Sequence, residues 1–224
     1  MAGISNTLRR IVSKATVKLA RYYTRRDRVF RYRQLRLKVL KDVFHPGLYR
    51  SSKTMAEWLE TQPLSGLRIL EIGCGSGLLS LVAAAKGAKV TAVDINATAV
   101  ENTRMNAAAN KLQINALQSD LFDSLPLAVE VDMVIANPPY YPKAPGNDLE
   151  QAWYCGEDFI YFRRLFDALR LRGLADKCYL VLSDTCDLDA IKTIAASKNI
   201  GLDPVSQKKI SGEWLIIYRT KLRN

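Results

Sequence analysis

The segment Asn137–Tyr140 reads Asn-Pro-Pro-Tyr, and these residue types can hold a planar nitrogen for chemistry. An amide or aromatic-amine nitrogen is a poor nucleophile because its lone pair is delocalised. The Asn137 side-chain oxygen and the Pro138 carbonyl oxygen can accept its N–H bonds and aim the lone pair at an electrophile, in directions that the prolines fix. Tyr140 offers a face for stacking, and positioning can then accelerate transfer without a general base. The alternative interpretation is a rigid turn that begins at Asn137.

A glycine-rich loop follows a short apolar stretch and reads Glu-Ile-Gly-Cys-Gly-Ser-Gly over residues 71–77. Its glycines Gly73, Gly75 and Gly77 allow a sharp turn and let a ligand approach the backbone closely. The spacing differs from the G-x-G-x-x-G of nicotinamide sites, and the acid Glu71 suits a cationic ligand better than a pyrophosphate. We interpret Cys74 as a small residue that fits the loop, because no histidine lies near it in sequence to activate a thiol.

Two more acids end the next predicted strands. Asp94, followed by Ile95, lies 17 residues after the last glycine of the loop and can accept both hydroxyls of a ribose. Asp120, followed by Leu121, can accept the exocyclic amine of an adenine. Each acid alone is also a plausible helix N-cap, but acids after three successive strands, together with the glycines, favour a ligand site.

The elements that must position these residues alternate between strand and helix. This alternation predicts an α/β fold in which helices cover both faces of a mostly parallel sheet, with ligands bound at the carboxyl ends of its strands. Two closing strands with little between them predict an antiparallel hairpin at one edge. We expect strands over residues 67–72, 89–93, 116–119, 131–136, 177–183, 203–208 and 213–220, and helices over 51–61 (capped by Ser51 or Ser52), 78–86, 97–110, 159–171 and 188–197.

Taken together, these motifs resemble a class I S-adenosylmethionine-dependent methyltransferase that methylates a planar nitrogen. The resemblance is closer still to the HemK/PrmC-type protein-glutamine methyltransferases that act on peptide-chain release factors. It covers about residues 45–220, and the segments 119–122, 137–142, 152–158 and 162–165 support it. It implies a Rossmann-like, seven-stranded fold and S-adenosylmethionine as the cofactor.

The resemblance also implies roles for the site residues. Glu71 and the glycines would contact the methionine part of the cofactor, Asp94 its ribose and Asp120 its adenine. Asn137 and Pro138 would hold the target nitrogen, and Tyr140 would pack on it. The complete predicted cofactor set is Glu71, Gly73, Cys74, Gly75, Gly77, Asp94, Ile95, Asp120, Leu121 and Asn137. The chain departs from the family in having no acid in the segment 47–54 after Pro46, and no visible helical N-terminal recognition domain.

The net charge of +11 lies entirely at the N-terminus. Residues 1–42 hold 13 lysines and arginines and two acids, whereas the rest of the chain balances at zero. We predict a basic helical arm over residues 1–44, with an apolar stripe at Leu8–Leu19 and a second helical stretch at about Val29–Val43, ahead of a methyltransferase domain over residues 45–224. Such an arm is typical of contact with RNA, DNA or a ribosome. A solvated helix docked on the body, a membrane-surface helix and an organelle transit peptide within residues 1–26 are the alternatives.

Two substrate classes stay open from the sequence. One is a glutamine in the Gly-Gly-Gln loop of a release factor or similar translation protein, which segment 152–165 favours. The other is adenine N6 or guanine N2 of RNA, which the basic arm favours. DNA methylation is not expected, because little length remains for a target-recognition domain, and intact motifs argue against a non-catalytic binding protein.

The remaining composition narrows the setting of the protein. Four cysteines without a CxxC pair and the single His45 predict neither a disulfide framework nor a metal site. The chain has no apolar run of membrane-spanning length and no secretory signal, so we expect a cytoplasmic protein.

Overall fold

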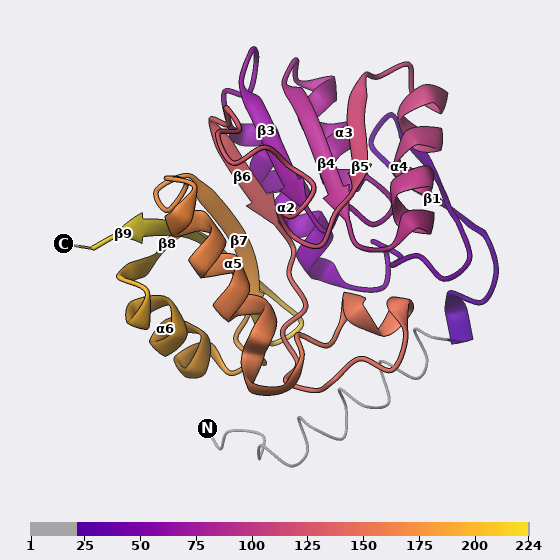
Figure 1. Cartoon of the computed structure of the whole chain (residues 1–224). Helices are drawn as coiled ribbons and strands as arrows, with labels where there is room; N and C mark the ends of the chain where they lie inside the picture. The colour runs from indigo at the N-terminus through magenta and orange to yellow at the C-terminus, as the bar shows by residue number, and fades with distance from the viewer. Residues whose placement is uncertain (1–21, 224) are drawn as a thin grey trace.

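The computed structural model describes residues 22–223, and its centre is a seven-stranded sheet (Figure 1). The strand order is β5-β4-β3-β6-β7-β9-β8, and all neighbours run parallel except that β9 is antiparallel to β7 and β8. This arrangement confirms the predicted fold, including the C-terminal antiparallel hairpin. The strands are β3 (Arg68–Ile72), β4 (Lys89–Asp94), β5 (Ile114–Gln118), β6 (Met133–Ala136), β7 (Cys178–Ser183), β8 (Ile200–Ile210) and β9 (Glu213–Leu222).

Helices cover both faces of the sheet, because successive side chains on the buried strands point to opposite sides. On one face Leu70 and Val134 join a core with Phe162 of α5 (Ile160–Leu171) and Ile191 of α6 (Leu188–Ser197). On the other face the core is made by α2 (Arg50–Thr61), α3 (Leu78–Ala85) and part of α4 (Ala97–Ala109). Two 3-10 helices, η1 (Asp148–Ala152) and η2 (Glu157–Phe159), lie in the long connection between β6 and α5. The order of strands reverses between β3 and β6, which is where such sheets bind ligands.

The predicted helical stretch at Val29–Val43 is wrong, because the chain forms an antiparallel hairpin there. Its strands are β1 (Arg28–Tyr32) and β2 (Leu35–Val39). Phe30, Tyr32, Leu37 and Val39 are buried at alternate positions, and charged side chains lie between them. This period of two is typical of a half-buried strand, but the density of arginine and lysine concealed it.

A ladder of asparagine side chains joins this hairpin to α4. The Oδ1 atoms of Asn102, Asn106 and Asn110 accept bonds of 2.8–3.0 Å from the backbone N–H groups of Leu40, Lys38 and Arg36. Their Nδ2 atoms donate back to backbone carbonyls, and Asn106 also donates to Ser76 in the glycine-rich loop at 2.9 Å. We name Asn102, Asn106 and Asn110 the asparagine ladder; it fixes the hairpin to the sheet-and-helix body.

Helix α2 begins one residue earlier than predicted, and the predicted serine cap is wrong. Tyr49 is its N-cap residue and makes no side-chain cap bond, whereas Ser51 and Ser52 lie inside the first turn and are buried. The side chains of these serines are therefore available for other partners.

Some expectations lie beyond what the structure describes or tests. The predicted apolar stripe Leu8–Leu19 lies outside residues 22–223. So do most of the residues of the possible transit peptide, residues 1–26. The division of the chain at residue 44 and the cytoplasmic location stay predictions. Within the described residues no helix has the length and apolar character needed to cross a bilayer.

Candidate active site

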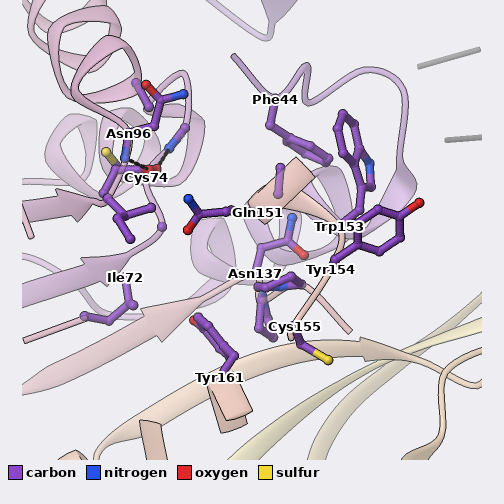
Figure 2. A pocket seen from close by; sticks show the side chains of 18 of the residues that line it. Phe44, Ile72, Cys74, Asn96, Asn137, Gln151, Trp153, Tyr154, Cys155 and Tyr161 are labelled. Carbon is purple, nitrogen blue, oxygen red and sulfur yellow. Dashed lines mark hydrogen bonds between the residues drawn. The ribbon is translucent and has the colours of Figure 1, made fainter. Parts of the chain in front are cut away.

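A cavity of about 240 Å³ opens at the carboxyl ends of β3, β4 and β6. Figure 2 shows Cys74 and Asn96 on one side of it, Asn137 in the middle, and Phe44, Trp153 and Tyr154 on the other side. The fold brings nearly all of the predicted site residues to its wall, namely Glu71, Gly73, Cys74, Gly75, Asp94, Ile95, Asp120, Leu121, Asn137, Pro138 and Tyr140.

Gly77 is the predicted site residue that does not line the cavity. It precedes α3 with a φ of 85°, and a Cβ there would lie 2.9 Å from Thr103 Oγ1. A glycine is therefore required at position 77 because of the positive φ and the close contact with Thr103, and not because a ligand approaches the backbone there. At Gly73, in contrast, φ is 76° and a Cβ would meet no atom of the described residues within 4 Å.

Asp94 ends β4 and ties the glycine-rich loop to the next strand. Its Oδ2 accepts the N–H of Gly75 at 2.8 Å, and its Oδ1 accepts the N–H of Asn96 at 2.9 Å. Burial raises the pKa of this carboxyl above its ordinary value, and the backbone donors oppose that rise. A carboxylate has about four acceptor sites, so Asp94 retains the capacity to accept the two hydroxyls of a ribose.

Glu71 lies one residue before the end of β3, and it is buried in the lining of the cavity. Its Oε2 accepts bonds from the backbone N–H of Ser80, at 2.8 Å, and from the Ser80 hydroxyl. Burial raises the pKa of Glu71 to about 8 despite these donors. A cation placed in the cavity would favour the ionised form, so this residue is suited to respond to a positively charged ligand.

Cys74 is held as a neutral thiol. Burial, followed by the charges of Asp94 and Glu71, raises its pKa well above the ordinary value. Thr103 donates a hydrogen bond to its sulfur at 3.3 Å. These surroundings agree with its interpretation as a small loop residue and not a nucleophile.

Asp120 has a partner that the sequence did not reveal. Arg164 of α5 donates to its Oδ2 at 2.7 Å and reaches Asp123 at 3.3 Å. The adenine-binding role predicted for Asp120 has to use the acceptor sites that Arg164 leaves free. Because Arg164 lies 44 positions further along the chain, only the tertiary structure could identify this ion pair.

Asn137 follows β6 and has its side-chain amide oriented. Its Nδ2 donates to the Ser52 hydroxyl at 3.0 Å. Within the described part of the chain, Asn137 Oδ1 accepts no hydrogen bond, so this oxygen remains free to accept an N–H bond from a ligand. Tyr140 is buried and packs edge-on against Tyr141, with ring centroids 5.0 Å apart.

A wall of aromatic residues beside Asn137 was not predicted. Phe44 stacks on Tyr49 with ring centroids 5.4 Å apart, and both rings pack against Trp153. Backbone bonds of Tyr141 to Trp153 and Cys155, 3.1 and 2.9 Å long, hold the two parts of the connecting segment together. About 100 residues separate Phe44 from Trp153 in sequence, and no local motif links them.

The donors and acceptors of the cavity fit S-adenosylmethionine. Asp94 supplies acceptors for ribose hydroxyls, and Glu71 supplies a buried carboxylate for a cationic amino-acid and sulfonium portion. Ile95 and Leu121 follow the ends of neighbouring strands and line the cavity with apolar side chains. Among residues 22–223, no cluster of histidine, cysteine and acidic side chains could hold a metal ion.

Comparisons with known proteins agree with this fit. A family model described as methyltransferase small domain matches residues 34–152, more than half of the chain. A candidate protein N5-glutamine methyltransferase of Methanocaldococcus jannaschii is 34% identical over 113 residues, which are 50% of this chain and 56% of that protein. The ribosomal RNA small subunit methyltransferase C of Chromohalobacter salexigens is 35% identical over 105 residues, 43% of this chain and 31% of that protein. The matches thus span between about a third and just over half of these relatives.

Solved structures share the fold at lower identity. The T. thermophilus 16S rRNA N2 G1207 methyltransferase, in complex with AdoMet and guanosine, superposes with a TM-score of 0.60 at 19% identity, over 88% of this chain and 50% of that one. A chain of the E. cuniculi Mtq2–Trm112 complex, described as responsible for methylation of the termination factor eRF1, superposes with a TM-score of 0.61 at 22% identity, over 81% of this chain and 99% of that one.

Proposed function

Since the chain belongs to the methyltransferase small domain family, we propose that it is an S-adenosylmethionine-dependent enzyme that methylates a planar amide or amine nitrogen. The observation that carries this proposal is the orientation of Asn137. With Nδ2 bonded to Ser52, its Oδ1 is left to accept an N–H bond at the cavity wall. Pro138, which also lines the cavity, offers a backbone carbonyl as the second acceptor.

The chemistry then divides between the cofactor and the chain. When bound, S-adenosylmethionine supplies an electrophilic methyl group on a positively charged sulfur. Asn137 Oδ1 and the Pro138 carbonyl hold the two N–H bonds of the acceptor, which directs the nitrogen lone pair away from them. Asp94 holds the ribose, and ionised Glu71 complements positive charge in the same cavity. The acceleration comes from orientation and electrostatics, so no side chain has to remove a proton before transfer. As the N–CH₃ bond forms, the S–CH₃ bond would break and leave a neutral thioether, and the methylated nitrogen would then lose one of its N–H protons to water.

We propose a protein glutamine as the first acceptor, in a Gly-Gly-Gln loop of a release-factor-like translation protein. The resemblance to HemK/PrmC-type enzymes over segments 137–142 and 152–165 supports it, as does the similarity to the candidate N5-glutamine methyltransferase of M. jannaschii. A primary amide has the planar NH₂ group that two acceptors can hold.

The experiment offers both acceptor classes to one enzyme preparation. Tritiated S-adenosylmethionine is incubated with an unmodified release factor, and separately with total tRNA and rRNA. We expect label in the Gly-Gly-Gln peptide, located by mass spectrometry. Asn137→Ala should retain cofactor affinity while turnover falls about 100- to 1,000-fold, as for the loss of one transition-state hydrogen-bond partner. Undiminished turnover by this variant would exclude the nitrogen-holding role.

A second candidate acceptor is a base of RNA, and the outer face of the β1–β2 hairpin favours it. Arg31 and Arg36 lie directly opposite each other across the two strands, and both are exposed. Like charges in this position are destabilising, and neither side chain forms an ion pair with an acid of residues 22–223. An uncompensated pair of this kind fits a phosphate backbone.

Charge reversal is the appropriate test of this second candidate. Phe30 and Leu37 of the hairpin are buried in the core with residues of α2 and α3. Deleting the hairpin would therefore expose that core, and a loss of RNA binding could not be told from a loss of folding. The double variant Arg31→Glu/Arg36→Glu should stay folded and lose RNA affinity at low salt, and the slope of log affinity against log salt should become shallower by about two. If wild type transfers the tritium label to RNA and the double variant does not, the acceptor is a nucleobase and not a glutamine. Unchanged RNA affinity would remove the support for this candidate.

A further inference from the structure

The side-chain amide of Asn137 has two ends of opposite hydrogen-bonding character. Its Oδ1 accepts and its Nδ2 donates, so the proposed role requires Oδ1 to face the acceptor nitrogen. An amide turned over would present its own N–H groups to the N–H groups of the substrate. The amide therefore needs a partner that holds it with Oδ1 toward the cavity.

Ser52 is such a partner. Its hydroxyl oxygen accepts the N–H of Asn137 Nδ2 at 3.0 Å, and the residue is only 5% exposed. Both residues line the cavity although they lie 85 positions apart in sequence. A bond shielded from water in this way holds its partner more firmly than an exposed one.

Ser52 is also free of the task that serine usually performs at this place in a helix. It lies in the first turn of α2, where serine commonly caps the backbone N–H groups. Here Tyr49 is the N-cap residue, without a side-chain cap bond. Helix α2 itself is fixed, because Met55 and Leu59 are fully buried in the core of the sheet. The hydroxyl is thus carried on a rigid element.

We infer that Ser52 is a positioning residue, which holds the Asn137 amide with Oδ1 toward the nitrogen to be methylated. This inference rests on the proposed function of Asn137. Ser52 would act only through Asn137, without contacting the substrate.

The first test needs no substrate. In ¹⁵N-labelled protein, the side-chain amide signal of Asn137 is identified by its absence from the Asn137→Ala spectrum. We expect Ser52→Ala to shift this signal and speed its exchange with solvent, and Ser52→Thr, which keeps a hydroxyl, to preserve it. Thr54→Val is the matched control: Thr54 is buried on the same helix, and its hydroxyl has no hydrogen-bond partner among residues 22–223. An Asn137 signal that Ser52→Ala leaves unmoved would overturn the inference.

The second test separates positioning from folding. With the unmodified release factor or RNA that accepts label, Ser52→Ala should lower kcat about 5- to 30-fold at unchanged cofactor affinity, whereas Ser52→Thr should recover most of the activity. Ser52→Ala/Asn137→Ala should be no slower than Asn137→Ala alone, because the serine has nothing left to orient. Melting temperatures of all variants are compared to confirm that each is folded.

The outcomes distinguish this inference from the proposed function. If Asn137→Ala is slow and Ser52→Ala is as fast as wild type, Ser52 is not a positioning residue and the role of Asn137 stands. If the two losses add in the double variant, Ser52 acts on something other than Asn137. If Asn137→Ala keeps full turnover, the proposed function fails, while the amide spectrum still reports whether the Ser52 bond exists.

Discussion

Replacing Glu71 by glutamine should make the stability of the protein less sensitive to a rise in pH up to about 8. Glu71 is buried, and its pKa is about 8 in the folded protein against an ordinary value of 4.5. Between these two values the unfolded chain gives up the proton that the folded chain keeps. Stability therefore falls as pH rises through this window, which is the opposite of the usual behaviour of a salt-bridged carboxylate. The amide introduced by Glu71→Gln has no proton to lose, and its oxygen can still accept the bonds of Ser80.

The size of the effect follows from the width of the window. Each pH unit between the two pKa values costs the wild type up to about 1.4 kcal/mol. The difference in unfolding free energy between Glu71→Gln and wild type should therefore grow in favour of the variant by about 3 kcal/mol from about pH 5 to about pH 7. Any fixed cost of burying the new amide group shifts the whole curve and does not change its slope.

The measurement is urea unfolding followed by circular dichroism at several pH values between about 5 and about 9, which bracket the titration of Glu71. Glu101→Gln, at an exposed position of α4, is the control and should run parallel to wild type. Calorimetry supplies a second readout: binding of S-adenosylmethionine near neutral pH should release protons from wild type and fewer from Glu71→Gln, seen as a different dependence on the buffer. If Glu71→Gln also runs parallel to wild type, the buried carboxyl is not protonated in the folded state and the reasoning fails.

Three further changes test other parts of the site and its support. Asp94→Ala should weaken S-adenosylmethionine binding by about 1.5–3 kcal/mol in calorimetry, since it removes charged acceptors; unchanged affinity would exclude the ribose role. Asn106→Leu should lower the free energy of unfolding by about 2–4 kcal/mol, because backbone groups of Lys38 and Ser76 lose their partner, and a melting temperature equal to wild type would contradict this. Gly77→Ala should cost at least about 1–2 kcal/mol, because φ is 85° and the new Cβ meets Thr103, and a stability unaffected by the methyl group would be the opposing result.

The sheet and the cofactor side of the pocket could be predicted because their signals are local. Gly73, Asp94 and Asn137 each follow a recognisable apolar stretch, and parallel strands bring their carboxyl ends to one edge of the sheet. The Ser52–Asn137 and Asp120–Arg164 bonds could not be predicted in this way, since they join segments that only tertiary packing brings together.

The hairpin was missed for a different reason. Its period-two pattern is present in the sequence, but cations occupy almost every exposed position, and a basic charge run suggested a single solvated helix. The alternation of apolar and charged residues around Phe30, Leu37 and Val39, which are buried, would have predicted strands and not a helix. The aromatic wall at Phe44 and Trp153 has no such signal, because its members come from opposite parts of the chain.

The asparagine ladder works because two different repeats nearly coincide. Four residues of a helix advance about 6.0 Å, and two residues of a strand advance about 6.6 Å. Side chains at every fourth position of α4 and its C-cap residue Asn110 can therefore meet every second residue from Arg36 to Leu40, for three rungs before the mismatch accumulates. The helix thus takes the place of a neighbouring strand along the outer edge of β2, which removes that edge as a template for pairing with another chain. It also sets the register of the hairpin from outside: a slip by one residue would turn every buried side chain to the solvent, and the spacing of three amides forbids it.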